Sequence, residues 1–274
     1  MKIHGTTKGG AISKKDFGVA FSSAGGNGGG CENFEDSLGT DANGTVSGAT
    51  ISTSEKKFGA GAVSFDGSND SVSITGIAAD NAFSTNVGTI SCWIMVDSPS
   101  VTDKTVFAWG DTNADTFLRV KVNQTDDENL LQFFCKIGGV TQWEGRSSTA
   151  VMGDGEWVNL IITQSGTTVE AYVNNEAVTW NAPTPPAVSS AWVNSDMDNF
   201  FLGAQKYNNV ALTSFFEGYV DDFVIFDTVI TSDQREFLQT NPASSLTDCD
   251  GIKAYYNCNE FDNSTLTNNA VPIE

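Results

Sequence analysis

The sequence predicts an all-β protein, an antiparallel sandwich of two sheets with extended N- and C-terminal segments. Residues 62–74 contain two short runs with alternating apolar residues, separated by the polar turn DGSND, a pattern typical of two strands joined by a tight turn. Residues 157–178 repeat this pattern around Ser165-Gly166 and are expected to form a β-hairpin. The chain of 274 residues also contains 18 phenylalanines, which supply enough large apolar side chains to fill a core between two sheets.

Strand-like runs recur along the chain, rich in β-branched and aromatic residues and separated by turn residues. The predicted strands are residues 33–34, 62–65, 71–74, 89–96, 105–109, 117–122, 130–137, 157–164, 167–173, 200–202 and 217–226. One helix is predicted over residues 231–238, where an N-cap residue precedes a run of helix formers. Residues 181–196 include three prolines, so we expect a long surface loop, because proline lacks the backbone donor that a central strand needs.

Composition divides the chain into three parts. Residues 1–30 form a basic, glycine-rich N-terminal arm, residues 31–240 the sandwich, and residues 241–274 a C-terminal extension with an additional strand. The segment AYYNCNEFDNSTL in this extension echoes CENFEDSL at the start of the sandwich. An additional strand of this kind pairs with a sheet edge, either of its own domain or of a neighbouring subunit. We favour its own domain, because that edge is always within reach.

The charge of the chain excludes nucleic acid as a partner. The formal net charge is -20, with only 14 lysines and arginines, whereas phosphate contacts require clustered basic side chains. Residues 1–30 carry a net charge of +3 and the remainder -23. The arm is therefore expected either to dock against the acidic body of a neighbouring copy or to remain a solvated tail.

The sequence shows neither a signal peptide nor an apolar run of the ~20 residues that a membrane span needs. We expect a soluble protein that does not insert into membranes. The five cysteines form no CxxC pair, so reduced and mostly buried thiols are expected, with a Cys249–Cys258 bridge as the alternative.

Five segments resemble, in the same order, elements of the laminin-G-like jelly rolls of the concanavalin-A-like superfamily. They are Phe65-Asp66-Gly67 with Asp70, GTISCWI (88–94), GEWVNL (155–160), VEAYVNN (169–175) and EGYVDDFVIF (217–226). The resemblance implies a concanavalin-A-like jelly roll over residues 31–240. The superfamily is functionally broad, so the resemblance alone implies no particular activity.

The flanking segments KGGAISKKDFGVAF, LQTNP and AYYNCNE resemble segments around such jelly rolls in tailed-phage and related viral structural proteins. This resemblance implies a virion protein that assembles in the host cytoplasm. Its expected partners are other virion proteins and copies of itself, in a homo-oligomeric assembly.

No catalytic residues are predicted. Retaining glycosidases need two carboxylates about 5 Å apart. The enzymes that this sequence resembles carry them as alternating Glu and Asp residues on one strand. No Glu-x-Asp-x-x-Glu motif of this kind occurs in this sequence. Asp221 and Asp222 are adjacent, so their side chains are expected on opposite faces of a strand. The single histidine, His4, lies in the arm, so no Ser/His/Asp constellation is expected in the sandwich.

Calcium is the cofactor that the resemblance implies. Many relatives place a structural calcium where the first strand meets the final Asp-Asp strand, which nominates Asp36 and Asp222 as oxygen ligands. The alternative is that Asp222 caps a turn and Asp36 is solvated.

Loop aromatics predict a glycan-binding surface. Sugar sites combine aromatic rings with amide and carboxylate groups, and four aromatics fall in or beside predicted loops rich in Asn and Asp, namely Trp143, Trp180, Trp192 and Tyr207. These rings could instead pack on the sandwich.

Together, these features predict a non-enzymatic virion structural, decoration or tail-associated protein, attached through its terminal segments and binding host-surface glycans. The alternatives are a free carbohydrate-binding lectin-type domain and a divergent polysaccharide hydrolase.

Overall fold

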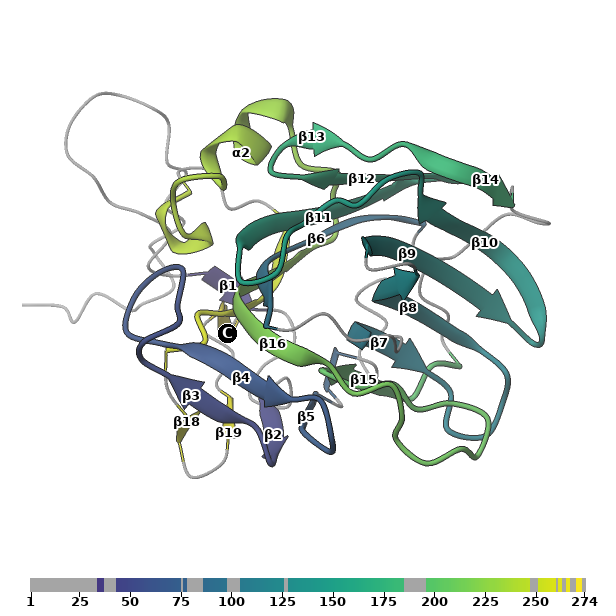
Figure 1. The fold of residues 1–274 in the computed structure, drawn as a ribbon, viewed down its shortest axis with the longest axis horizontal. Coiled ribbons are helices and arrows are strands. Elements are labelled where there is room, and N and C mark those ends of the chain that lie inside the picture. Colours follow the sequence, from purple (N-terminus) through teal and green to yellow (C-terminus); the bar gives the residue numbers. More distant parts are fainter. Residues whose placement is uncertain are drawn as a thin grey trace, which may run out of the picture.

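Two antiparallel sheets pack face to face in the computed structural model, which confirms the predicted jelly-roll sandwich (Figure 1). The structure describes residues 34–36, 43–74, 76–77, 86–97, 104–125, 128–184, 196–246, 251–259, 261–262, 265–266 and 270–272. The predicted arm, residues 1–30, lies outside these ranges.

The ten-stranded sheet contains, in order, β14 (Trp180–Thr184), β10 (Val140–Ser147), β9 (Glu128–Ile137), β8 (Phe117–Thr125), β7 (Lys104–Gly110), β15 (Asn199–Leu202), β5 (Ser71–Ser73), β2 (Gly44–Ser47), β19 (Thr265–Leu266) and β18 (Phe261–Asp262).

The eight-stranded sheet contains, in order, β13 (Glu176–Ala177), β12 (Thr168–Val173), β11 (Trp157–Ser165), β6 (Val87–Val96), β16 (Glu217–Phe226), β4 (Ala62–Asp66) and β3 (Thr50–Ser52), with β17 (Ile252–Tyr256) also paired to β16. A separate parallel pair joins β1 (Phe34–Asp36) to β20 (Ala270–Pro272).

Helix α2 (Ser232–Phe237) confirms the predicted helix. Its N-cap, Thr231, forms a capping box with Gln234, in which each side chain bonds the other's backbone N–H. The helix and the 3₁₀ turn η3 (Ala243–Ser245) lie against the outer side of the eight-stranded sheet, where Val224, Phe226 and Leu238 belong to one buried apolar cluster.

The main core lies between the two sheets. Its largest fully buried side chains include Trp109, Phe107, Phe133, Phe200 and Phe223. Their rings pack at centroid distances of 4.3 Å (Trp109–Phe200) and 5.7 Å (Phe107–Phe223). Burial of such aromatic surface is the dominant stabilising contribution in a sandwich of this kind.

Two strands at the edge of the ten-stranded sheet were not predicted. The sequence left residues 138–156 without a strand, yet β10 forms there and carries Trp143 inward. The sequence predicts a surface loop over residues 181–196, and for residues 181–184 this prediction is wrong, because they belong to β14, which includes Pro183. Proline is tolerated there because, among the described strands, β14 is the outermost of its sheet and pairs with β10 alone.

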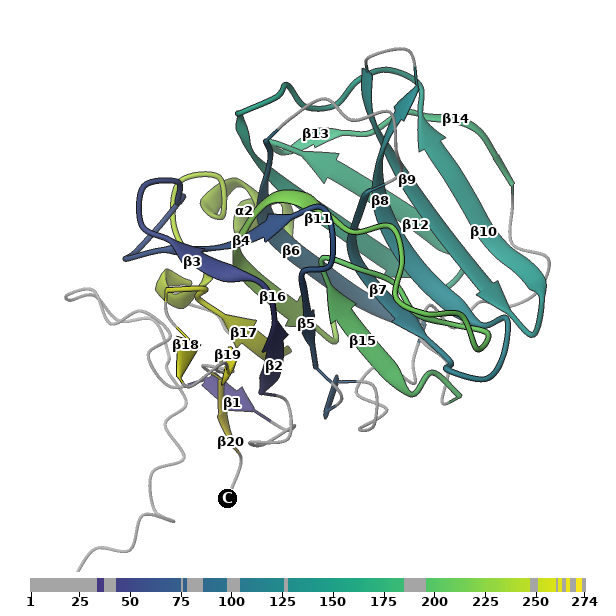
Figure 2. The same ribbon diagram turned by 60° about the horizontal axis from the view of Figure 1, so that its bottom comes forward.

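The C-terminal extension pairs with its own domain, as favoured from the sequence. Strand β17 hydrogen-bonds the second half of β16, with Tyr256 opposite Phe223, and β19 pairs with β2. Figure 2 shows β17, β18 and β19 at the end of the molecule away from β10 and β14. The extension thereby joins both sheets.

The described cysteines, Cys92, Cys135 and Cys258, are buried and take part in no disulfide bond. The alternative bridge between Cys249 and Cys258 is therefore not formed. In the described part of the chain, no helix has the length and apolar character needed to cross a bilayer.

Candidate functional site

Strands β8, β9 and β10 turn alternate side chains away from the core, and these side chains form the outer face of the ten-stranded sheet. Every second residue of a strand points to the same side, and the strand register aligns such residues in rows across the three strands. The rows on the outer face are Arg119–Phe134–Glu144 and Lys121–Gln132–Arg146, with Phe117 opposite Lys136 beside them.

Aromatic rings enclose a guanidinium group on this face. The central carbon of the Arg119 guanidinium lies 4.7 Å from the ring centroid of Phe117 and 5.0 Å from that of Phe134. The Phe117 ring in turn lies 4.3 Å from the ring of Tyr207. We call Phe117, Arg119, Phe134 and Tyr207 the aromatic–arginine cluster. Contacts at these distances are favourable cation–π interactions, strengthened by partial burial.

The connection between β15 and β16 covers part of the outer face and brings Tyr207 to it. Arg119 Nη1 donates a 3.2 Å hydrogen bond to Gln205 Oε1, and Lys121 Nζ lies 3.4 Å from Ser214 Oγ. The connection starts at Gly203, whose φ is +79° and where an added Cβ would meet the ring of Phe65. Only glycine fits such a position without strain.

Basic side chains gather on this face although the chain as a whole is acidic. Of the 14 lysines and arginines, four lie on the outer-face rows and a fifth, Lys206, lies on the covering connection. Lys136 forms a 2.8 Å ion pair with Asp115. Among the described residues, no carboxylate lies within ion-pair distance of Arg119 or Arg146, and Arg119 Nε is buried without a hydrogen-bond partner.

The structure separates the aromatics that were predicted to bind glycans. Trp143 is only 6% exposed and packs between Phe133, at 5.3 Å, and Trp180, at 5.0 Å, so its ring is a core element. Trp180 is half-buried on β14, and Trp192 lies outside the described residues. Of the three predicted aromatics that the structure describes, Tyr207 alone joins the aromatic–arginine cluster.

Asp221 and Asp222 lie on the same face of β16, so the expectation of opposite faces is wrong. Between Asp221 and Val224 the pairing of β16 with β6 slips by one residue, and Asp222 has a positive φ of 50°. Val220 and Phe223 both face the core between the sheets, three residues apart. The extra residue of this bulge breaks the alternation and turns both aspartates outward.

Each aspartate is buried and bonded to a different part of the chain. Asp221 Oδ2 accepts the backbone N–H groups of Lys57 and Phe58, both at 2.9 Å. Asp222 accepts a 2.8 Å bond from the Tyr255 hydroxyl and a 2.9 Å bond from the Ala243 N–H. These bonds fasten the loop before β4, strand β17 and η3 to β16.

Burial raises the pKa of both carboxyl groups. The pKa of Asp221 rises to about 6 and that of Asp222 to about 7, because removal from water penalises the charged form. The hydrogen bonds from Tyr255 and Ala243 act in the opposite direction at Asp222, and the negative charge of Asp221 raises its pKa further.

The predicted calcium ligands receive little support from this geometry. Asp222 is 3% exposed, and both its carboxylate oxygens already accept protein hydrogen bonds. The side chain of Asp36 lies outside the described residues, and no cluster of three or more potential metal ligands occurs among those described. The residues present do not fit a calcium ion at Asp222, and calcium at Asp36 stays a prediction.

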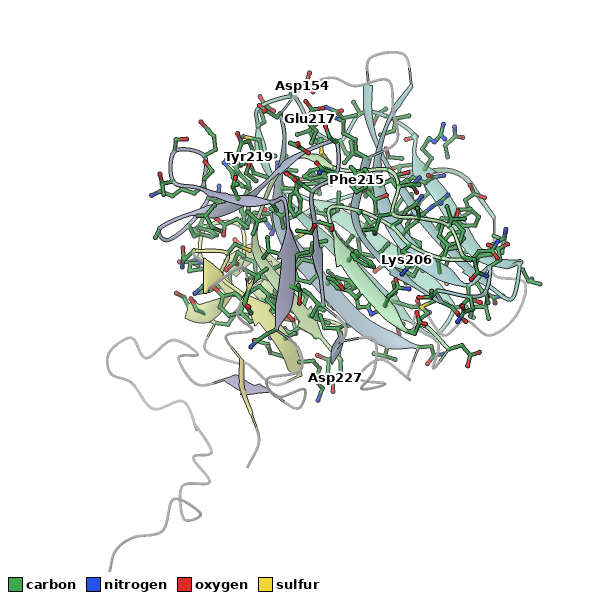
Figure 3. All side chains as sticks on the ribbon, turned by 90° about the horizontal axis from the view of Figure 1, so that it is seen from below. Asp154, Lys206, Phe215, Glu217, Tyr219 and Asp227 are labelled. Carbon is green, nitrogen blue, oxygen red and sulfur yellow. The ribbon has the colours of Figure 1, made fainter. Side chains whose placement is uncertain are left out.

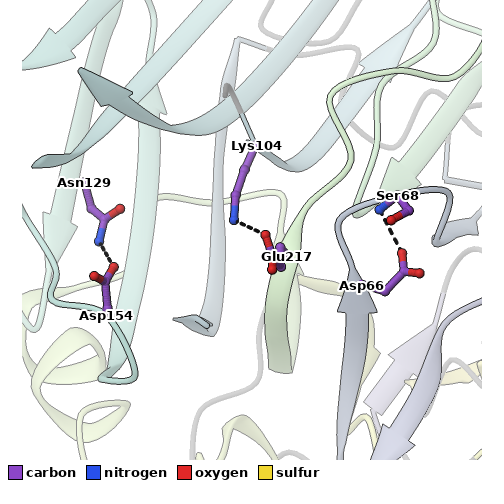
Figure 4. Close-up of polar contacts among 6 residues, drawn as sticks. All are labelled: Asp66, Ser68, Lys104, Asn129, Asp154 and Glu217. Atoms are coloured by element: carbon purple, nitrogen blue, oxygen red, sulfur yellow. Dashed lines mark hydrogen bonds and ion pairs between the residues drawn. The ribbon is translucent and has the colours of Figure 1, made fainter. Parts of the chain in front are cut away.

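Polar contacts also order one end of the sandwich. Figure 3 shows Asp154 and Glu217 at this end and Asp227 at the opposite one. Lys104 Nζ lies 2.7 Å from Glu217 Oε2, Asn129 Nδ2 donates to Asp154 Oδ1 at 2.8 Å, and Ser68 N–H donates to Asp66 Oδ1 at 2.8 Å (Figure 4). These groups bind one another and hold the loops in place.

A family model described as the concanavalin A-like lectin/glucanases superfamily, of laminin G type, matches residues 66–234, which is more than half of the chain. The chain belongs to this family. The predicted laminin-G-like, concanavalin-A-like resemblance is thereby confirmed. The matched segment of this concanavalin A-like protein runs from the last residue of β4 into α2.

Solved structures share its fold at low sequence identity. Domain 4 of AbnA, an extracellular GH43 arabinanase from Geobacillus stearothermophilus in complex with arabinotriose, is 16% identical with a TM-score of 0.50, and the match covers 76% of this chain and 86% of that domain. The CBM40 of the Ruminococcus gnavus IT-sialidase is 12% identical with a TM-score of 0.50, with 74% and 100% covered.

The NanB sialidase from Streptococcus pneumoniae is 15% identical with a TM-score of 0.53, and the match covers 75% of this chain but 28% of the sialidase. No curated protein sequence matches this chain. At these identities the likeness shows the jelly-roll fold of this concanavalin A-like protein and nothing further about its ligands.

Proposed function

We propose that this protein is a non-enzymatic carbohydrate-binding jelly roll that holds saccharides on the outer face of the ten-stranded sheet. The observation that carries the proposal is the aromatic–arginine cluster, in which the half-buried rings of Phe134 and Tyr207 lie with a half-buried guanidinium on a sheet face, beside the buried ring of Phe117. Saccharide sites combine apolar ring surfaces with a few fixed hydrogen-bonding groups. Arg119 and Glu144, both half-buried, supply such groups beside the rings.

The similar structures support this proposal. The arabinanase domain is in complex with arabinotriose, and the module of the IT-sialidase is a CBM40. Both are parts of glycosidases, and each matched segment covers nearly all of that part. A binding role without turnover on the same fold is therefore a reasonable expectation for this chain.

The described carboxylates also favour binding over hydrolysis. Asp221 and Asp222 do lie on one face, but they are 0% and 3% exposed and bonded to backbone and Tyr255. A glycosidase pair must reach the sugar that it cleaves. We therefore propose that these aspartates stabilise the fold and do not contact substrate.

The experiment that tests the proposal is retention of the full chain on immobilised saccharides. Tyr207→Ala should weaken retention at least five-fold, because it removes a ring from the cluster. Tyr172→Ala is the matched control, since Tyr172 also stacks on an arginine, with Arg235 4.1 Å from its ring, but lies on the other sheet. Loss of retention in both variants, in neither, or no retention of the parent protein would contradict the proposal.

A second candidate function is attachment within a virion, and the charge division of the chain favours it. In this proposal the arm, with net charge +3, docks against the acidic body of a neighbouring copy, whose net charge is -23. The C-terminal extension, paired with its own domain, is not needed for this contact. Light scattering of the full chain and of a chain lacking residues 1–30 tests it. An oligomer that depends on the arm and dissociates in salt supports attachment, and a monomer in both cases contradicts it.

A further inference from the structure

We propose that the outer face recognises an anionic saccharide, whose carboxylate or sulfate groups bind Arg119 and Arg146. This inference deepens the proposed function and rests on it, because it names the class of saccharide that the same face would hold.

The first argument is charge. The outer face concentrates basic groups in a protein of net charge -20. Electrostatic fields are screened over about 8 Å at physiological ionic strength, so a group bound at this face interacts mainly with the local side chains and not with the distant acidic surface. Two described acidic groups lie close to these basic groups. Asp115 is paired with Lys136, and Glu144 is separated from Arg119 by the strand that carries Phe134. Gln132 Nε2 donates to Glu144 at 3.3 Å.

The second argument is the state of the two guanidinium groups. Arg119 bonds Gln205 through Nη1 alone and has no carboxylate partner among the described residues, and the structure gives Arg146 no ion pair there either. A partly exposed arginine without an acidic partner retains donors for a ligand. The planar guanidinium fork matches a carboxylate or sulfate better than an ammonium does.

The third argument is spacing. Arg119 lies on β8 and Arg146 on β10, two strands apart and one row apart in register. Standard strand spacing and rise place their Cα atoms about 12 Å apart. A short oligosaccharide spans this distance, and a polymer with one anionic group per sugar meets both arginines at once. The rings of Phe117 and Phe134 hold the Arg119 guanidinium in place, which reduces the entropy lost on binding.

Matched pairs of polymers test this inference. The probes are polygalacturonate against its methyl ester, and dextran sulfate against dextran, each titrated into the full chain. We expect at least ten-fold tighter binding of the charged member of one pair or both. The pair that shows the preference tells whether a carboxylate or a sulfate is recognised. Equal binding of charged and neutral members would overturn the inference and leave the proposed function intact, whereas binding of no saccharide at all would overturn both.

Variants connect the preference to the two arginines. Arg119→Gln and Arg146→Gln should each lower affinity for the charged polymer at least ten-fold. Arg146→Gln should change affinity for the neutral polymer less than two-fold, whereas Arg119→Gln should weaken the binding of both polymers, because Arg119 belongs to the aromatic–arginine cluster. Arg146→Gln is the safer variant, because Arg119 also holds Gln205. Arg235→Gln is the matched control, since it removes an equally charged, ring-stacked arginine from the other side of the molecule. A charge preference that survives Arg146→Gln and Arg119→Gln, or that Arg235→Gln also removes, would contradict the assignment.

Discussion

The hydroxyl of Tyr255 donates a 2.8 Å hydrogen bond to the buried carboxylate of Asp222. The two residues lie on neighbouring strands, β17 and β16, at the place where β16 exchanges one partner strand for another. Its first half pairs with β4 up to Val220, and its second half pairs with β17 from Phe223 onward. The bulge at Asp222 falls between these halves, so this bond ties the C-terminal extension to the sandwich.

Tyr255→Phe should lower the free energy of unfolding by about 1–3 kcal/mol, because the buried carboxyl group of Asp222 loses a hydrogen-bond donor. Urea unfolding followed by fluorescence measures this change. Tyr172→Phe is the control, since its hydroxyl also bonds a carboxylate, Glu170 at 3.0 Å, but at the exposed surface. We expect that variant to stay within about 0.5 kcal/mol of the parent. Equal losses in the two variants would show that the burial of Asp222 has no special effect.

Asp222→Asn should flatten the pH dependence of stability. Burial raises the pKa of Asp222 from 3.8 to about 7, so the folded state keeps a proton that the unfolded chain releases. The free energy of unfolding therefore falls as pH rises from about 4 to about 7, and this contribution is constant above that range. Asparagine does not titrate and tolerates the positive φ of this position.

Denaturant midpoints at several pH values between 4 and 8 measure this slope. The control is Glu176→Gln, an exposed residue of the edge strand β13. An Asp222→Asn profile parallel to that of the parent protein would contradict the assignment of the slope to Asp222.

Trp143→Ala should destabilise the protein by about 3–5 kcal/mol, as is usual for a buried tryptophan replaced by alanine. Trp143 is 6% exposed and lies between Phe133 and Trp180. Tyr207→Ala should cost much less, because Tyr207 is half-buried on the connection to β16. Thermal unfolding of both variants measures which one loses more stability. A small loss for Trp143→Ala would contradict a core role for Trp143 and would again make it a candidate ligand-binding residue.

Deletion of residues 251–274 should leave a chain that aggregates or unfolds. It removes β17 and exposes the edge of β16 from Phe223 to Phe226, all buried in the intact protein. A separate peptide of residues 251–274 should restore solubility when added before refolding. Size-exclusion chromatography measures both results, and a soluble, cooperatively folded truncated monomer would show that the extension is dispensable.

Only part of the outer face of the ten-stranded sheet could be predicted from the sequence. Phe117, Arg119 and Lys121 alternate along one strand, as do Phe134 and Lys136 on the next, and this alternation marks a half-exposed sheet. Which strands adjoin each other depends on long-range pairing that alternation alone does not specify. Tyr207 was identified as a candidate, but its neighbours were missed because they lie in predicted strands.

Turn residues, alternation and capping are local properties of the chain, so the sequence predicts the all-β sandwich, the hairpin of β11 and β12, the capped helix and the phenylalanine-rich core. The turn at residues 67–70 is also local, but it joins β4 in one sheet to β5 in the other, which no local pattern predicts. Three further features likewise follow from the tertiary structure: the burial of Trp143, the bulge that turns both aspartates to one side, and the register that aligns Arg119 with Phe134. These features arise from the packing of residues that are distant in sequence, where the free energy of a contact depends on a neighbour that no local pattern specifies.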